Sequence, residues 1–357
     1  MTANRTLLWF ALAFLNTLLF SCSGGKGEGS NHDGTDSTDI QYLRSQNPDT
    51  AFGQTDLYPK NESGLKLKEL TDLVAKHMEM KNYAYARHYL DIAIERDSNH
   101  EVVLDQDAGL NLITNRSRNA NRLWEKCVKL YPKEINCRVH LAQLKLSLGL
   151  NSDALKLANE IIGINPQKAE GYFIKGMCIR ALKGDTTGSI PYFQKAVDLK
   201  SDYIEALDML GYIFAQRKDT LALAYYRRIL GIDPKRGDVY FKMGVFHMER
   251  REWNKAMAAY ENAITRNPQD ADSHFNLGFI YIELEEFSKA RLQFSKAVGS
   301  SQRNYKAHYG RAYAAERLGD LQNAATDYRE ALSINPKHQP SAEGLNRVKE
   351  KLNLKPN

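Results

Sequence analysis

The fold is decided by the stretch GDVYFKMGVFHMERREWNKAMAAYENAITRNPQD, which runs from Gly237 to Asp270. Apolar residues recur at helical spacing over two segments of about a dozen residues each, and a short polar stretch separates the segments. Pro268 follows the second segment, where its missing amide proton ends a helix. The stretch therefore predicts two helices joined by a tight turn.

The same pattern follows twice more without a gap. Residues 271–304 and residues 305–338 align with it, so the period is 34 residues. Small residues suit places where paired helices approach closely, and an aromatic ring fills the hollow beside them. Both kinds recur in fixed columns: Gly244, Gly278 and Ala312; Ala256, Ala290 and Ala324; Ala263, Ala297 and Ala331; Tyr260, Phe294 and Tyr328.

This pattern resembles the tetratricopeptide repeat, a helix-turn-helix unit with the same period. The register continues upstream through two further blocks, and then through three earlier ones in which Val74, Asp107 and Lys145 depart from it. The resemblance implies an all-α fold, a right-handed α-solenoid of about eight repeats over residues 66–338. In that family the first helix of each repeat lines a concave face.

Residues 339–357 are expected to form a capping helix and a short tail. Leu345, Val348 and Leu352 fall on one face of the expected helix, with charged residues opposite. Such a helix suits the capping role that the end of a repeat array requires.

The amino end predicts an export signal. Arg5 precedes an apolar run from Leu7 to Phe20, which is shorter than the roughly 18 residues of a spanning helix. Residues 19–22, Leu-Phe-Ser-Cys, resemble the bacterial lipobox, loosely at Phe20. The resemblance implies a lipoprotein signal peptide over residues 1–21 and a lipidated Cys22 at the mature amino end. An uncleaved membrane anchor is the alternative.

Residues 22–65 are expected to form a solvated tether, because they are rich in Gly, Ser, Thr and Asn. Three basic against seven acidic side chains give residues 23–65 a net charge of −4. The whole chain carries +6, so the folded remainder, with Arg5 set aside, carries +9. Its basic residues form no dense block in the sequence, which argues against a nucleic-acid partner.

The sequence shows no motif of a catalytic, cofactor or metal site. It has no phosphate-binding glycine loop, nucleophile elbow, Cys-x-x-Cys or His-Glu-x-x-His. His274 and His308 hold equivalent positions in neighbouring repeats, but two ligands are too few for a metal site, so structural roles are expected. Cys127 and Cys137 either form a disulfide or fill small buried positions, and Cys178 is expected in the core.

The resemblance also places a binding surface. In the family, the groove is lined by the second, fifth, ninth, twelfth and thirteenth positions of each first helix. Those positions are unusually aromatic toward the carboxyl-terminal half of this chain, and acidic residues flank them, which favours a peptide with apolar anchors and basic residues. The alternative is that these rings only pack against one another. The expected peptide-binding residues are Phe173, Met177, Tyr212, Phe241, Met248, Phe275, Phe279, Tyr309 and Tyr313.

The sequence therefore predicts a membrane-anchored scaffold or adaptor rather than an enzyme, with no cofactor and no small-molecule substrate. The lipobox resemblance implies a bacterial cell envelope, with an outer membrane and a periplasmic location favoured by Ser23 and by the lack of acidic residues directly after Cys22. One alternative is a pilotin-like assembly factor for a pilus or secretion system. Another is an enzyme with a site in the irregular first three repeats, and a third is a regulatory domain separated from a larger enzyme.

Overall fold

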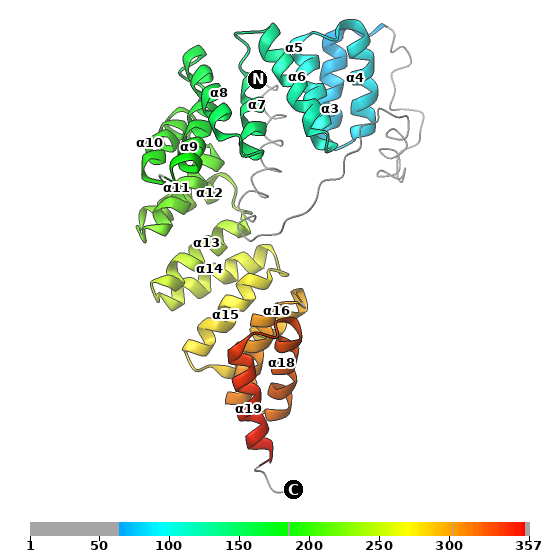
Figure 1. Ribbon diagram of the computed structural model, residues 1–357. Helices are drawn as coiled ribbons and strands as arrows, with labels where there is room; N and C mark the ends of the chain where they lie inside the picture. The colour runs from blue at the N-terminus through cyan, green and yellow to red at the C-terminus, as the bar shows by residue number, and fades with distance from the viewer. Residues whose placement is uncertain (1–63, 185, 302, 354–357) are drawn as a thin grey trace. The chain divides into compact units, whose positions relative to one another are not determined.

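The computed structural model describes residues 64–184, 186–301 and 303–353 (Figure 1). Residues 1–63 lie outside these ranges, and with them the expected signal peptide, Cys22 and nearly all of the expected tether. The regular structure of the described ranges is helical, and no β-strand occurs in them. None of the helices there is both long enough and apolar enough to cross a bilayer.

The chain divides into two compact units, residues 1–201 and residues 202–357. The described helices of unit 1 are α3 (Leu67–Glu79), α4 (Tyr83–Asp97), α5 (Glu101–Ile113), α6 (Ser117–Leu130), α7 (Asn136–Ser147), α8 (Asn151–Ile164), α9 (Ala169–Lys183) and α10 (Thr186–Leu199). Those of unit 2 are α11 (Ile204–Gln216), α12 (Leu221–Ile232), α13 (Gly237–Glu249), α14 (Trp253–Arg266), α15 (Ala271–Glu283), α16 (Phe287–Ser300), α17 (Tyr305–Arg317), α18 (Leu321–Ile334) and α19 (Gln339–Asn353).

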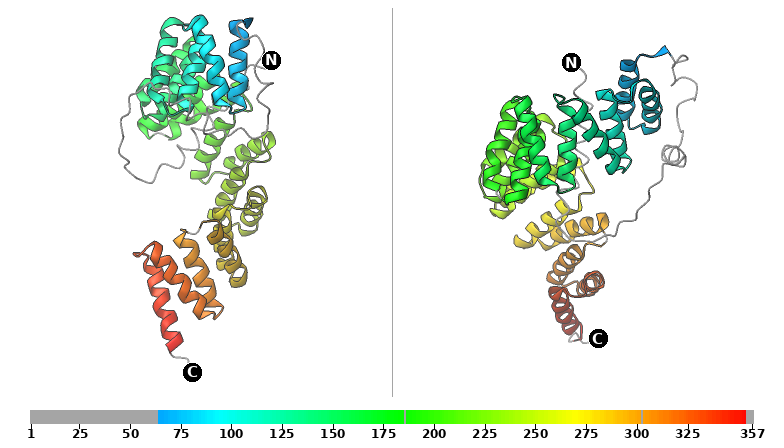
Figure 2. Two further views of the ribbon diagram at one scale, coloured as in Figure 1. Left: turned by 90° about the vertical axis from the view of Figure 1, so that its right-hand side faces the viewer. Right: turned by 45° about the horizontal axis from the view of Figure 1, so that its top comes forward.

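Within each unit, consecutive helices pack side by side as hairpins (Figures 1 and 2). The described residues hold eight such pairs, from α3 with α4 to α17 with α18. Each first helix also packs against the second helix of the preceding pair in its own unit. The prediction of an all-α helical-repeat solenoid is therefore confirmed.

The tight turn inside each pair requires one residue in the left-handed conformation. Glycine adopts a positive φ freely, and Gly149, Gly184 and Gly319 do so in three of the eight turns. The other five turns place a residue with a side chain there, at φ between 56° and 62°: Lys81, Asn115, Lys218, Arg251 and Glu285. The turn geometry therefore holds even where the residue type opposes it.

The recurring small residues and rings form the core of each pair. Ala256, Tyr260 and Ala263 of α14 are all buried. Gly244 of α13 faces the Tyr260 ring so closely that an added Cβ would stand 2.6 Å from a ring carbon. The column of small residues is thus the space that the neighbouring ring occupies.

Helix α19 packs on α18 and covers the last pair. Leu345 and Val348 bury their side chains against the core of that pair, and Leu352 is partly buried beside them. The Glu316 carboxylate of α17 is 6% exposed and accepts hydrogen bonds from Arg347 Nη2 at 3.1 Å and Lys351 Nζ at 2.8 Å. Apolar contacts and two ion pairs to the buried Glu316 carboxylate together hold α19 on the last pair.

In unit 1, two of the positions that depart from the repeat pattern make ion pairs between consecutive repeats. Arg87 of α4 donates to Asp107 of α5 at 2.8 Å. Lys145 of α7 donates to Glu125 of α6 at 2.9 Å. Polar contacts thus replace some of the apolar packing between these repeats.

Candidate functional site

The predicted binding residues of unit 2 lie on the first helices of its four pairs. On α15, for example, Asp272, Phe275, Phe279 and Glu283 are spaced by three or four residues and share one face of the helix. The equivalent face of α17 carries Lys306, Tyr309, Tyr313 and Arg317. We call the surface formed by these faces of α11, α13, α15 and α17 the first-helix surface.

The ring at the fifth position of a repeat packs on the core ring of the same repeat. Ring centroids are 5.7 Å apart for Phe241 and Tyr260, 5.6 Å for Phe275 and Phe294, and 6.0 Å for Tyr309 and Tyr328. The three outer rings are only partly buried. Each therefore belongs to its repeat's packing and still presents part of its face to the first-helix surface.

Two other predicted residues are substantially exposed. Tyr212 on α11 is 39% exposed and Phe279 on α15 is 41% exposed. A large aromatic side chain exposed to this degree is the kind of group that anchors protein interfaces. These two rings are the most exposed of the predicted binding rings.

Met248 and Tyr313 are less exposed than Tyr212 and Phe279. Both are partly buried. The Tyr260 hydroxyl lies 3.7 Å from Met248 Sδ, and Arg317 Nη1 donates to the Tyr313 hydroxyl at 3.0 Å. The Arg317 guanidinium also lies over the Phe287 ring, 4.3 Å from its centroid. Tyr313 and Arg317 are therefore held by contacts within the unit.

Unit 1 holds the remaining predicted residues, Phe173 and Met177, on α9. Phe173 is 4% exposed and packs on Phe193 with ring centroids 5.7 Å apart. Met177 is partly buried. The Phe173 ring thus offers little surface to a ligand, which is what the packing alternative expected at this position.

The acidic residues around the first-helix surface form two groups. In the first group, Asp208 of α11 accepts from Lys242 of α13 at 2.7 Å, and Asp238 accepts from Arg236 at 2.7 Å. These carboxylates are already matched by cations of the same unit.

The second group has no such partners in the described part of the chain. Glu249, Asp272 and Glu283 are exposed, and none of them forms an ion pair there. Partial burial and the nearby charge of Asp270 raise the pKa of Asp272 above its ordinary value. Burial and a like charge both disfavour the ionised form of a carboxyl, and an opposite charge placed beside Asp272 would favour it.

His274 and His308, for which the sequence predicted structural roles, are both buried among residues of unit 2. His274 is buried, with Nδ1 2.8 Å from Gln293 Oε1 and Nε2 3.2 Å from the Pro268 carbonyl oxygen. His308 is buried with Nδ1 3.6 Å from Asp327 Oδ1. Across the described ranges, His, Cys, Asp and Glu side chains form no group able to hold a metal ion.

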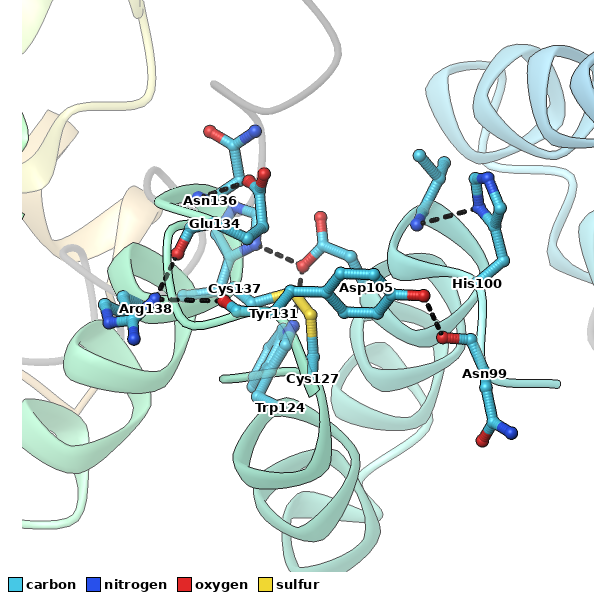
Figure 3. The surroundings of a disulfide bond; sticks show 12 residues. Asn99, His100, Asp105, Trp124, Cys127, Tyr131, Glu134, Asn136, Cys137 and Arg138 are labelled. Atoms are coloured by element: carbon cyan, nitrogen blue, oxygen red, sulfur yellow. Dashed lines mark hydrogen bonds and ion pairs between the residues drawn. A yellow bond between two sulfur atoms is a disulfide. The ribbon is translucent and has the colours of Figure 1, made fainter. Parts of the chain in front are cut away.

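Cys127 of α6 and Cys137 of α7 form a disulfide, which decides between the two alternatives that the sequence left open (Figure 3). Beside it, Asp105 of α5 accepts a hydrogen bond from Trp124 Nε1 at 2.7 Å and lies 2.7 Å from His140 Nδ1. Asp105 stands at the fifth position of its repeat, where four later repeats carry the aromatic residues Phe173, Phe241, Phe275 and Tyr309.

Cys178 on α9 is a buried free thiol, as expected. Burial raises the pKa of the Cys178 thiol to about 12. A thiol so rarely ionised at neutral pH is a poor nucleophile, so it serves as a core side chain.

Comparison with known proteins agrees with the repeat pattern. The family described as "Tetratricopeptide repeat" matches residues 280–338, and the one described as "TPR repeat" matches residues 247–285. No curated protein matches the chain.

Three similar solved structures are all of low identity. A crystal structure of MamA protein is 23% identical over 48% of this chain and 94% of its own, with a TM-score of 0.44. The Cut9-Hcn1 hetero-tetramer of the APC/C is 16% identical over 87% of this chain and 58% of its own, with a TM-score of 0.49. The first TPR of Spaghetti (RPAP3), bound to an HSP90 peptide, is 21% identical over 34% of this chain and 96% of its own, with a TM-score of 0.33.

The family matches cover three of the helix pairs in unit 2 in whole or in part, and the same hairpin recurs eight times in the described residues. The chain therefore contains tetratricopeptide repeats, which the family models match over residues 247–338.

Proposed function

We propose that this protein is a scaffold that binds a partner peptide on the first-helix surface of unit 2. The observation that carries the proposal is the exposed Phe279 ring on α15, which lies on the same helix face as Asp272 and Glu283. An exposed aromatic ring between carboxylates that lack ion pairs is suited to a peptide rather than to a reaction, because it offers contact area and charge.

The proposed peptide carries an apolar anchor and at least one Lys or Arg. The anchor would cover the exposed part of Phe279 and the partly buried Phe275 beside it. The basic side chain would reach Glu249, Asp272 or Glu283, which form no ion pair with the residues that the structure describes. A bound cation would lower the pKa of Asp272, since an opposite charge favours the ionised carboxyl.

A random-peptide library displayed on phage tests this proposal when it is selected against the full chain. We expect the enriched peptides to combine an aliphatic or aromatic residue with Lys or Arg, and to lose binding to the Phe279→Ala variant. Leu292→Ala is the matched control. Leu292 is 56% exposed, but it lies on α16, the second helix of its pair, and so is not part of the first-helix surface. Enrichment of acidic peptides, or equal loss of binding in both variants, would refute the proposal.

We further propose that Cys22 anchors the scaffold to an envelope membrane through a lipid. The proposal rests on the lipobox resemblance of residues 19–22. The disulfide in unit 1 supports it, because disulfides persist mainly in oxidising compartments such as the periplasm. Each buried methylene of an acyl chain adds about 0.8 kcal/mol of membrane affinity, so two or three chains anchor a protein durably.

Metabolic labelling with a clickable fatty acid tests the anchor. We expect the wild-type protein to be labelled and the Cys22→Ser protein to remain unlabelled and to keep its amino-terminal segment. Cys178→Ser is the control, because Cys178 is buried in unit 1 and is not a candidate for lipidation. Label retained by the Cys22→Ser protein would rule out this anchor.

A further inference from the structure

Helix α6 carries a row of basic side chains along its outer face. Arg118, Arg122, Lys126 and Lys129 are all exposed. At 100° per residue, these four positions fall within an arc of about 80° around the helix axis. They are spread over the sequence, so no dense block stands out there, and only the helix brings them together. We call these four residues the α6 basic row.

The opposite face of α6 fixes the row in place. Ala120, Trp124 and Cys127 are buried in the core of unit 1. Trp124 donates to Asp105 of α5, and Cys127 is bonded to Cys137 of α7 (Figure 3). The helix therefore cannot rotate to hide its basic side chains, and the row is a rigid feature of the unit.

Among the described residues of unit 1, no acidic side chain pairs with the row. Glu125 is the acidic residue on this side of α6, and its carboxylate accepts from Lys145 of α7 at 2.9 Å. The hydrogen bond from Lys145, with a weaker one from Asn121, outweighs burial and lowers the pKa of Glu125. None of the four basic side chains forms an ion pair with the described residues. Exposed Lys133 adds a fifth positive charge just beyond the helix.

We infer that the α6 basic row docks unit 1 on a bilayer that contains anionic phospholipid. The row is straight and about 16 Å long, so several lipid phosphates can meet it at once. Basic residues held in this way at an anionic surface strengthen binding roughly fivefold each. Unit 1 is the first folded unit after Cys22 in the chain. The inference rests on the proposed lipid anchor only because that anchor would hold the α6 basic row near the membrane.

Lysine footprinting of the full-length protein on vesicles tests this inference. The protein is added to vesicles of phosphatidylcholine alone, or of phosphatidylcholine with phosphatidylglycerol, and treated with a membrane-impermeant acetylating reagent. We expect Lys126 and Lys129 to react about fivefold more slowly on the anionic vesicles and to recover in high salt, which screens exposed charges. Exposed Lys156 on α8 and Lys195 on α10 should react equally on both.

A pair of variants with the same change in net charge completes the test. Arg122→Glu with Lys126→Glu should abolish the protection of Lys129, whereas Lys156→Glu with Lys195→Glu should leave it intact. Near-ultraviolet circular dichroism checks that both variants fold. Equal reactivity of Lys129 on the two vesicle types would overturn the inference. Equal protection of the two row lysines and the two control lysines would also overturn it, as would protection that appears only when a second protein is added. Flotation with the phosphatidylcholine vesicles reports the lipid anchor separately.

Discussion

Gly344 of α19 lies against the ring of Tyr328 of α18, so closely that an added Cβ would stand 2.4 Å from the ring's Cζ atom. The same relationship joins Gly244 to Tyr260 and Gly278 to Phe294, at 2.6 Å and 2.9 Å. Real Cβ atoms do not approach ring carbons so closely, because the overlap is strongly repulsive. A glycine on one helix and an aromatic ring on a neighbouring helix therefore interlock at these three places in unit 2.

Gly244→Ala should destabilise unit 2 by about 1–3 kcal/mol, because the Tyr260 ring is fully buried and has no space to move into. Gly299→Ala is the matched control in the same unit. A Cβ at Gly299 of α16 meets no atom within 4 Å, so that change should be neutral or stabilise by up to about 1 kcal/mol. Denaturant melts of both variants check the prediction, and equal effects would contradict it.

Arg251→Gly should stabilise the protein by about 0.5–1 kcal/mol, because Arg251 holds a φ of 56° that glycine adopts without steric cost. Glycine introduced inside a helix should instead destabilise the protein. Ala258→Gly on the exposed side of α14 should cost about 1 kcal/mol. Thermal melts that show the same sign for both variants would refute this account of the turn.

Glu316→Gln should weaken the attachment of α19 by about 1–3 kcal/mol at neutral pH, because it leaves Arg347 and Lys351 without their shared carboxylate. Glu350→Gln, an exposed position on α19, is the control. Hydrogen exchange across α18 and α19 is the direct measurement. Unchanged protection of α19 in Glu316→Gln would show that apolar contacts alone hold the cap.

The effect of Glu316 should depend on pH. Burial opposes ionisation of this carboxyl, but hydrogen bonds from Arg347, Lys351 and Tyr328 outweigh it and hold its pKa below the ordinary value of 4.5. Stability from a lowered pKa is present above the unfolded-state value and is lost as the pH falls through the folded-state value. The difference in stability between wild type and Glu316→Gln should therefore shrink below about pH 4.5. A difference that grows in acid would contradict this assignment.

Replacing both Cys127 and Cys137 by Ala should destabilise unit 1 by about 2–3 kcal/mol, the value expected for closing a short loop. Cys178→Ala removes a buried sulfur from the same unit without removing a bridge, and so serves as the control. Hydrogen exchange should rise in α6 and α7 and stay unchanged in α13 to α18. Equal exchange in α6 and α7 with and without the bridge would refute the prediction.

The repeat architecture could be predicted from the sequence because it depends on local periodicity. The column of Gly244, Gly278 and Ala312 and the ring column of Tyr260, Phe294 and Tyr328 recur every 34 residues. Each residue in these columns packs within one hairpin or against the next, so the sequence period maps directly onto the contacts.

The polar contacts could not be predicted in the same way. Glu316 meets Arg347 and Lys351, which lie 31 and 35 residues further along, and nothing distinguishes these residues from other charges in the sequence. The pairing of Cys127 with Cys137 depended on whether α6 and α7 bring two sulfurs together. The α6 basic row was missed because its members are separated in the sequence by two or three other residues.

The candidate site was predicted only in part, because the fifth position of each repeat has two neighbours. Its ring faces the core ring of its own repeat on one side and the first-helix surface on the other, as for Phe275 and Phe294. Sequence spacing places the residue on the correct helix face but does not say how deeply the ring is buried. At the fifth position, Phe173 is almost fully buried whereas Phe275 is only partly buried. At the ninth position, Phe279 is 41% exposed.

The most direct test of the proposed scaffold is the affinity of a selected basic, apolar peptide for three forms of the full chain, measured by calorimetry. Wild type and Leu292→Ala should bind equally. Phe279→Ala should bind at least about tenfold more weakly, the loss expected of an interface anchor. Equal affinity of all three forms, with unchanged melting temperatures, would contradict the claim that the first-helix surface of unit 2 is the binding site.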